Sequence, residues 1–205
     1  ELKFLVDIEK GQKTGFFIDQ RENRKLIGSL SRNKKVLNAF GFTGGFSIYA
    51  LSGGASEVVT VDISKEACLQ AIENASLNNF GTKKHKAIAV DCFDYLREMD
   101  LDFDLIILDP PAFAKNAHSV DKATKGYKDI NLQAFKKSKP DGLIASFSCS
   151  QHIDRELFRK ILMGAAQDSG RFVQILHSFD QPLDHPIAIG HPEGEYLKGF
   201  LMRVS

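Results

Sequence analysis

Short apolar runs alternate with segments of helical spacing along most of this chain, and that alternation limits the fold more than any other feature. Between most of the runs, helical spacing covers residues 45–52, 64–79, 92–99, 126–138 and 154–168. The runs are continuous rather than alternating, which predicts parallel strands covered by helices on both faces. The predicted class is therefore α/β, with a doubly wound, mostly parallel sheet. Its predicted strands are KVLNAF (35–40), EVVTVD (57–62), KAIAVD (86–91), FDLIILD (103–109), GLIASFS (142–148) and RFVQILHSF (171–179).

The two ends of the chain predict additions to this sheet. Residues 1–19 read as two strands around a Lys-Gly turn, a β-hairpin that a polar helix from Arg21 follows. The last run, YLKGFLMRV (196–204), alternates well enough to predict an edge strand antiparallel to the one before it. We expect an N-terminal extension over 1–33 and one main domain over 34–205.

Composition excludes several classes of protein. With 43% hydrophobic and 26% charged residues, the sequence is typical of a folded globular domain. It contains no apolar stretch approaching the roughly 20 residues of a spanning helix and no basic-then-apolar leader, so we expect a cytoplasmic protein with no membrane partner. Three cysteines without CxxC spacing predict neither a disulfide framework nor a metal site. The net charge of +1 argues against a strongly basic nucleic-acid binder, although charge can gather locally.

In a sheet of this kind, ligands bind at the carboxyl ends of the strands. After the first strand, NAFGFTGGFS (38–47) holds three glycines that allow a tight turn and close approach to a ligand at a helix N-terminus. It lacks the dinucleotide fingerprint, so a plain strand-to-helix turn stays an alternative. The next two strands end at Asp62 and Asp91, which suit ribose hydroxyls and an adenine, or are helix caps.

The fourth and fifth strands end in residues that could take part in chemistry. Asp109 opens DPPAFAK (109–115), whose two prolines predict a rigid loop that presents this carboxylate to the cleft. Cys149 lies at the end of the fifth strand, within LIASFSCS (143–150), at the same predicted edge. A free cysteine is usually inert packing, which is how we interpret Cys68 and Cys92. A strand-end thiol near a helix N-terminus can instead become a nucleophile, and we assign Cys149 to that class.

Together these features resemble class I S-adenosylmethionine-dependent methyltransferases, which implies a Rossmann-like sheet. More narrowly, the chain resembles the bacterial 23S ribosomal RNA 5-methylcytosine methyltransferases of the RlmI type. Members of that family also carry an RNA-binding PUA domain, and the resemblance here covers the catalytic domain alone. It lies in GFFIDQRENR (15–24), NAFGFTGGFS, DPPAFAK, GYKDIN (126–131), FSCS (147–150), DHP (184–186) and PEGEYLKGF (192–200).

The resemblance implies roles for individual residues. Cys149 would add as a thiolate to C6 of cytosine, while Asp109 hydrogen-bonds or protonates N3. The base that removes the C5 proton is not identified. The glycine loop would hold the methionine part of the cofactor, Asp62 the ribose and Asp91 the adenine. The S-adenosylmethionine contacts implied in this way are Asp19, Gln20, Arg21, Phe40, Thr43, Gly44, Asp62, Ile63, Asp91, Cys92 and Asp109.

RNA is the partner that the resemblance implies. Residues 115–139 contain seven lysines against two aspartates, which predicts either a solvated helix face or a track for phosphates. Aromatic rings nearby could stack on an extruded base. The predicted substrate contacts are Pro110, Phe113, Lys115, Tyr127 and Lys128.

Two other functions fit part of the sequence. An Asp-Pro-Pro-aromatic loop also serves amino-group methylation of guanine or adenine, which needs no cysteine, although Ala112 fits that pattern imperfectly. A cofactor-binding or RNA-binding module without catalysis is the second alternative. Whether the chain forms a homodimer is left open by the sequence.

Overall fold

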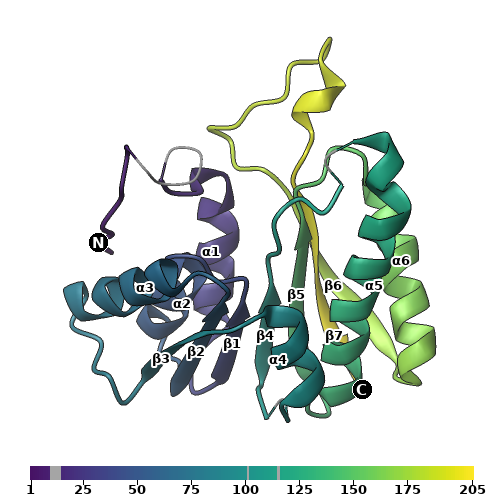
Figure 1. Ribbon diagram of the computed structural model, residues 1–205. Coiled ribbons are helices and arrows are strands. Elements are labelled where there is room, and N and C mark those ends of the chain that lie inside the picture. Colours follow the sequence, from purple (N-terminus) through teal and green to yellow (C-terminus); the bar gives the residue numbers. More distant parts are fainter. Residues whose placement is uncertain (10–14, 101, 115) are drawn as a thin grey trace.

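A seven-stranded sheet organises the chain, as predicted (Figure 1). The structure is a computed structural model, and it describes residues 1–9, 15–100, 102–114 and 116–205. The strand order is β3-β2-β1-β4-β5-β7-β6, and every pair from β3 across to β5 is parallel. The strands are β1 (Lys35–Ala39), β2 (Glu57–Asp62), β3 (His85–Ala89), β4 (Leu105–Leu108), β5 (Gly142–Ser148), β6 (Val173–Phe179) and β7 (Lys198–Val204).

The last strand is antiparallel, but it is not at an edge. β7 pairs with β5 on one side and with β6 on the other, antiparallel to both. The predicted edge position was therefore wrong, and β6 is the edge strand. Burial explains this order, because β7 is almost wholly buried while most of β6 is exposed or half-buried.

Helices cover both faces of the sheet, and each face has its own core (Figure 1). Side chains of α1 and α2 pack on one face with Val36, Val58 and Ile107. Side chains of α4, α5 and α6 pack on the other face with Leu37, Ile106 and Ile144. The helices are α1 (Arg21–Ser29), α2 (Gly45–Ser52), α3 (Lys65–Leu77), α4 (Cys92–Glu98), α5 (Val120–Lys137) and α6 (Arg155–Ser169).

The predicted β-hairpin at the N-terminus was wrong for the residues that the structure describes. Residues 1–9 and 15–17 contain no strand, and the predicted Lys-Gly turn lies outside the described residues. Asparagine side chains of α3 bind the backbone of this segment instead, since Asn74 Oδ1 accepts from Leu5 N at 2.8 Å and Asn78 Oδ1 from Lys3 N at 2.9 Å. An apolar run can therefore satisfy its backbone without a partner strand.

The predicted polar helix from Arg21 is present as α1, and it packs closely against the main domain. A Cβ on Gly53 would lie 1.8 Å from the carbonyl oxygen of Gly28, so only glycine fits where α1 meets the end of α2. Ile27 is fully buried in the core that these helices share. Within the predicted extension 1–33, α1 thus covers part of one face of the sheet.

The carboxyl edge of the sheet gathers the loops that carry the predicted site. β6 ends and β7 begins at this edge, so the connection 180–197 stands over it (Figure 1). The loops after β1, β2, β4 and β5 meet at the same edge, because these strands are parallel. In the described part of the chain, no helix is long and apolar enough to cross a membrane.

Candidate active site

The glycine loop after β1 is held in an unusual backbone conformation. Phe40, Phe42 and Gly44 all have positive φ, at 59°, 46° and 81°. Gly44 is the N-cap of α2, and its left-handed conformation is one that glycine adopts without strain. The amide of Phe42 donates to Asp62 Oδ2 at 2.9 Å, which ties the loop to the end of β2. The loop therefore presents the first amides of α2 at the carboxyl edge, as an anionic group would need.

The two acidic strand ends serve the local backbone as well. Asp62 Oδ1 accepts from Ser64 N at 2.9 Å, although the cap of α3 is Ser64 rather than Asp62. Asp91 caps α4 through Phe93 N and Asp94 N, at 2.7 and 3.3 Å. A carboxylate has about four lone-pair sites, so these bonds leave both residues able to accept from a ligand. Ile63 lies beside Asp62 and is 72% exposed, an apolar surface next to the acidic group.

Thr43 and Cys92 lie inside the protein. Thr43 is 2% exposed, and its carbonyl accepts from Asn74 Nδ2 at 2.9 Å. Cys92 is 3% exposed, and its sulfur accepts from Phe40 N at 3.2 Å and donates to Val61 O at 3.4 Å. Burial raises the pKa of the Cys92 thiol to about 12, which makes it unreactive at neutral pH. Cofactor contacts of Thr43 and Cys92 would have to come from backbone atoms.

Four aromatic rings connect the loop after β1 with the loop after β4. Phe40 packs edge-on against Phe93 and Phe113, with centroids 5.9 and 6.2 Å away. Phe113 is half-buried and lies 4.6 Å from the ring of Tyr127. Tyr127 has no exposed surface, and its hydroxyl bonds to Ser150 Oγ at 3.0 Å. Burial of this kind is incompatible with the predicted stacking of Tyr127 on a base, because the α5 core and Phe113 already cover its ring.

Three different contacts hold the predicted cofactor residues Asp19, Gln20 and Arg21. Asp19 Oδ2 accepts from the hydroxyl of Tyr196 at 2.6 Å. Gln20 is 3% exposed and donates through Nε2 to Asp109 Oδ1 at 3.0 Å. Arg21 reaches the 180–197 connection instead, where Nη1 lies 2.6 Å from Asp184 Oδ2. These residues therefore join η1 (Ile18–Gln20) and the start of α1 to the loop after β4 and to the 180–197 connection.

Asp109 and Cys149 lie at the ends of neighbouring strands, as predicted. β4 pairs with β5 with Leu108 opposite Ser146, so the two loops leave the sheet side by side. The sulfur of Cys149 lies 3.9 Å from the carbonyl oxygen of Pro110. Cys149 is partly exposed, whereas Cys68 and Cys92 are buried. These exposures agree with the interpretation of Cys68 and Cys92 as packing residues and of Cys149 as an accessible thiol.

Some lysines of the lysine-rich segment 115–139 make contacts within the fold. Lys128 Nζ lies 2.7 Å from Asp168 Oδ2, so its ammonium faces α6. Lys137 Nζ donates to the carbonyls of Leu96 and Met99 at the end of α4. Lys115 lies outside the described residues. The predicted phosphate track is therefore partly used for contacts within the fold.

Two residues of the PEGEYLKGF motif lie at the site, although no role followed from the sequence. Tyr196 contacts Asp19, and burial with that carboxylate nearby raises the pKa of the phenol. Lys198 is 4% exposed, and its Nζ donates to the carbonyl of Ser150 at 2.7 Å. A lysine that opens a final strand with only one other charged residue, Arg203, was the signal that could have revealed the second of these.

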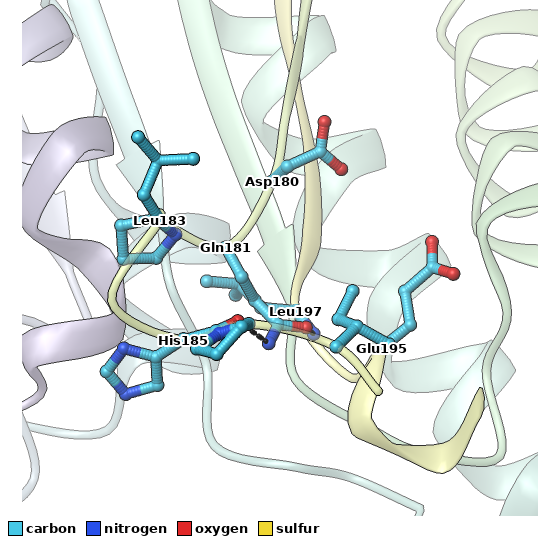
Figure 2. A pocket seen from close by; sticks show the side chains of 9 residues that line it. Asp180, Gln181, Leu183, His185, Glu195 and Leu197 are labelled. Carbon is cyan, nitrogen blue, oxygen red and sulfur yellow. Dashed lines mark hydrogen bonds between the residues drawn. The ribbon is translucent and has the colours of Figure 1, made fainter. Parts of the chain in front are cut away.

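A hollow of about 250 Å³ lies beside these residues (Figure 2). The side chain of Gln181 closes its base, since Oε1 accepts from Tyr196 N at 3.0 Å and Nε2 donates to His185 O at 3.4 Å. Leu183 is 97% exposed at its rim. Among the described residues, no cluster of histidine, cysteine and acidic side chains could hold a metal ion.

Comparison with known proteins identifies the family. The family model for S-adenosylmethionine-dependent methyltransferases matches residues 1–177. The chain belongs to this family. Among curated proteins, it is 48% identical over 205 residues to the ribosomal RNA large subunit methyltransferase I of Tolumonas auensis and 47% identical to that of Aeromonas salmonicida. The match covers 98% of this chain and 52% of each relative, so the chain spans about half their length.

Solved methyltransferases share the fold of this one. A methyltransferase solved with S-adenosylhomocysteine superposes with a TM-score of 0.88 at 29% identity, covering 99% of this chain and 54% of the other. An S-adenosylmethionine-dependent methyltransferase from Streptococcus mutans gives 0.87 at 27% identity, covering 99% and 53%. The Rossmann-like fold and the cofactor predicted from sequence are both confirmed by these matches.

The chemistry of the strand ends fits S-adenosylmethionine. Its ribose carries two hydroxyl donors, and Asp62 offers acceptor sites at the end of β2. Its adenine has an apolar face and an amino group, and Ile63, Phe40 and Asp91 supply apolar surface and an acceptor near that strand end. Its carboxylate suits the first amides of α2 after Gly44.

Proposed function

We propose that this chain is the methyltransferase domain of an enzyme that methylates C5 of a cytosine in large-subunit ribosomal RNA. The observation that carries the proposal is the partly exposed thiol of Cys149 beside the Asp109–Pro110 loop. The relatives support the RNA class, since eight curated proteins that are 43–48% identical to this chain are named ribosomal RNA large subunit methyltransferase I.

Cys149 and Asp109 each act in one step of this mechanism. Cytosine C5 is a weak nucleophile, so the base must first gain electron density. Addition of the Cys149 thiolate to C6 supplies it, while the protonated carboxyl group of Asp109 donates its proton to N3, which neutralises the negative charge that develops there. S-adenosylmethionine supplies an electrophilic methyl group when it is bound. After C5 has been methylated and has lost its proton, the C6–S bond breaks and the thiolate of Cys149 leaves.

The contacts around Asp109 suit this role. Gln20 donates to Oδ1 of Asp109, and the oxygen of its own amide accepts from Asn23 Nδ2 at 2.7 Å, which fixes the orientation of the amide. These two hydrogen bonds fix the position of the Asp109 carboxyl group at the end of β4. Prolines at 110 and 111 keep the loop extended, so the geometry does not have to form upon binding.

A trapping assay tests the proposal. RNA transcribed with 5-fluorocytidine should form a covalent complex with the chain when S-adenosylmethionine is present, because fluorine cannot leave C5 as a proton does. The complex should form with the wild type and with Cys92→Ala, which removes a buried thiol, but not with Cys149→Ala. Filter binding of the same RNA and calorimetry of the cofactor show that each variant still binds both.

The result that contradicts the proposal is equally specific. If Cys149→Ala still transfers methyl groups to RNA at the wild-type rate, Cys149 is not the nucleophile. Mass spectrometry of the methylated nucleoside then decides whether an amino group of guanine or adenine is the target.

A further inference from the structure

Lys198 is a lysine held inside the protein next to the proposed nucleophile. It is the first residue of β7 and pairs with Ser148, the residue before Cys149. Its side chain is 4% exposed, and Nζ donates to the carbonyl of Ser150, the residue after Cys149. The ammonium is therefore tethered to the short segment that carries the thiol.

The structure offers this ammonium no full counterion. Among the described residues, no carboxylate lies within ion-pair distance of Lys198. A buried charge is costly unless it is paired, and burial lowers the pKa of Lys198 to about 8. Lys198 and Cys149 interact electrostatically, and a negative charge on the sulfur would favour the ammonium. A thiolate at Cys149 would therefore favour the charged form of Lys198, which is held at the carbonyl of the next residue, Ser150.

The anchor of the ammonium is rigid. Ser150 N donates to Ser148 Oγ at 3.3 Å, and Ser150 Oγ bonds to Tyr127 at 3.0 Å and accepts from Ala114 N at 3.2 Å. These bonds hold the carbonyl of Ser150 in place. The distance from the ammonium to the Cys149 segment is consequently fixed by the core rather than by a mobile side chain.

We propose that Lys198 is a positioning residue that keeps the sulfur of Cys149 as a thiolate. The inference rests on the proposed function of Cys149 as nucleophile. The proton that leaves sulfur goes to solvent, and the ammonium, held at the carbonyl of Ser150, attracts the resulting anion. When the C6–S bond later breaks, the same charge stabilises the sulfur as leaving group, so Lys198 assists both addition and release.

Other charged groups face this pair from every neighbouring element. Asp154 and Glu195 favour the ammonium of Lys198, and Arg155 opposes it. Tyr127 of α5 and Tyr196 interact with Cys149, but burial raises the pKa of both phenols, so they stay neutral below pH 9. The pH profile of Cys149 is therefore interpreted as that of a coupled pair with Lys198.

Alkylation of Cys149 measures this effect without RNA. The rate of its reaction with iodoacetamide is followed by peptide mass spectrometry from pH 6 to pH 10, with buried Cys68 and Cys92 as unreactive internal references. We expect Lys198→Gln, which keeps a donor for the carbonyl of Ser150, to raise the pH of half-maximal reactivity by about one unit. The rate at pH 7 should then fall about tenfold.

Two further variants show whether charge is the cause. Lys198→Arg keeps the positive charge and should react within about twofold of the wild type. Lys160→Met removes an exposed lysine of α6 that pairs with Glu156 and should leave the profile unchanged. Thermal melting of all variants is recorded, since only folded protein is compared.

The inference is overturned if the profile of Lys198→Gln superposes on that of the wild type. It is also overturned if Lys198→Arg shifts as far as Lys198→Gln, because packing rather than charge would then be responsible. Failure of the proposed function has a different signature, since Cys149→Ala would keep its methyl transfer whatever the alkylation profiles show.

Discussion

Cys92 and Cys149 both follow strands at the carboxyl edge of one sheet, yet their surroundings differ in every respect. Cys92 follows β3, is 3% exposed and is bonded to two backbone groups. Cys149 follows β5, is partly exposed and lies beside a proline carbonyl and a buried lysine. The first thiol holds the glycine loop against β2, while the second is partly exposed beside the Asp109–Pro110 loop. Position at a strand end is thus insufficient, and the direction of the side chain decides between packing and chemistry.

Two buried titratable side chains, His85 and Lys198, differ in their charge at physiological pH. His85 at the start of β3 is 5% exposed, and its Nε2 lies 2.8 Å from Thr60 Oγ1 within a chain of polar groups under the glycine loop. Burial lowers the pKa of His85 to about 4, so it is neutral at physiological pH. Burial leaves the pKa of Lys198 at about 8, so it is mostly charged there. The buried histidine under the glycine loop is thus neutral, whereas the buried lysine close to the proposed reaction keeps its charge.

Replacing the two cysteines in parallel should give the largest contrast. We expect Cys149→Ala to lower the rate of methyl transfer at least about 10³-fold, equivalent to roughly 4 kcal/mol of transition-state stabilisation. The same variant should unfold within about 0.5 kcal/mol of the wild type, because the thiol is partly exposed. Single-turnover transfer of a radioactive methyl group and urea denaturation measure the two quantities. A Cys149→Ala protein with a nearly normal rate would break the comparison.

The fold was largely predictable, because hydrophobic pattern determines where parallel strands and their helices lie. Glu57–Asp62 and Gly142–Ser148 have the predicted bounds, and α2 does too. The order of the last two strands depends on which of them is more buried, and a run of residues does not reveal that. The N-terminal hairpin failed for a related reason, since asparagines of α3 bind that segment in place of a partner strand.

The site was predictable wherever a residue follows a strand. Asp62, Asp109 and Cys149 all lie at the predicted edge, because parallel strands bring their carboxyl ends together. Tyr127 was misjudged because helical spacing alone does not say which face of α5 meets the core. Lys198 and Tyr196 were missed because their importance comes from contacts across more than forty residues of sequence.

Acid should destabilise the protein through His85, the next largest effect. In the unfolded chain His85 takes up a proton near pH 6.5, but in the folded protein only near pH 4. Its contribution to stability is therefore complete above pH 6.5 and is lost as the pH falls from 6.5 towards 4. The loss should reach at most about 3 kcal/mol.

Urea denaturation at pH 7.5 and pH 5 measures this loss. His85→Gln is neutral at both values and should have a flatter pH dependence, while His177→Gln, which replaces an exposed histidine, should behave like the wild type. Equal pH dependence in all three proteins would show that His85 is not the responsible group.

Cys92→Ala should cost stability without changing the chemistry. The variant leaves a small cavity and removes the acceptor of the Phe40 amide, and we expect a loss of about 1–2 kcal/mol in the free energy of unfolding. The methyl-transfer rate per folded molecule should stay within a few-fold of the wild type. Cys92→Ser, which restores an acceptor, should recover part of the stability. A methyl-transfer rate as low as that of Cys149→Ala would mean that both thiols take part in the reaction, which contradicts the distinction between them.

The smallest effect should come from Tyr127→Phe, which tests how much the hydroxyl of Tyr127 contributes to positioning the segment around Cys149. The hydroxyl bonds to Ser148 at 3.1 Å and to Ser150 at 3.0 Å, on either side of Cys149. Since the ring is buried and is retained, we expect a loss of only about 1 kcal/mol in the free energy of unfolding and at most about a fivefold lower rate. Thermal melting and single-turnover transfer measure both. A rate loss above about a hundredfold with normal stability would mean that the hydroxyl itself takes part in the reaction, because removal of a supporting hydrogen bond does not cost that much.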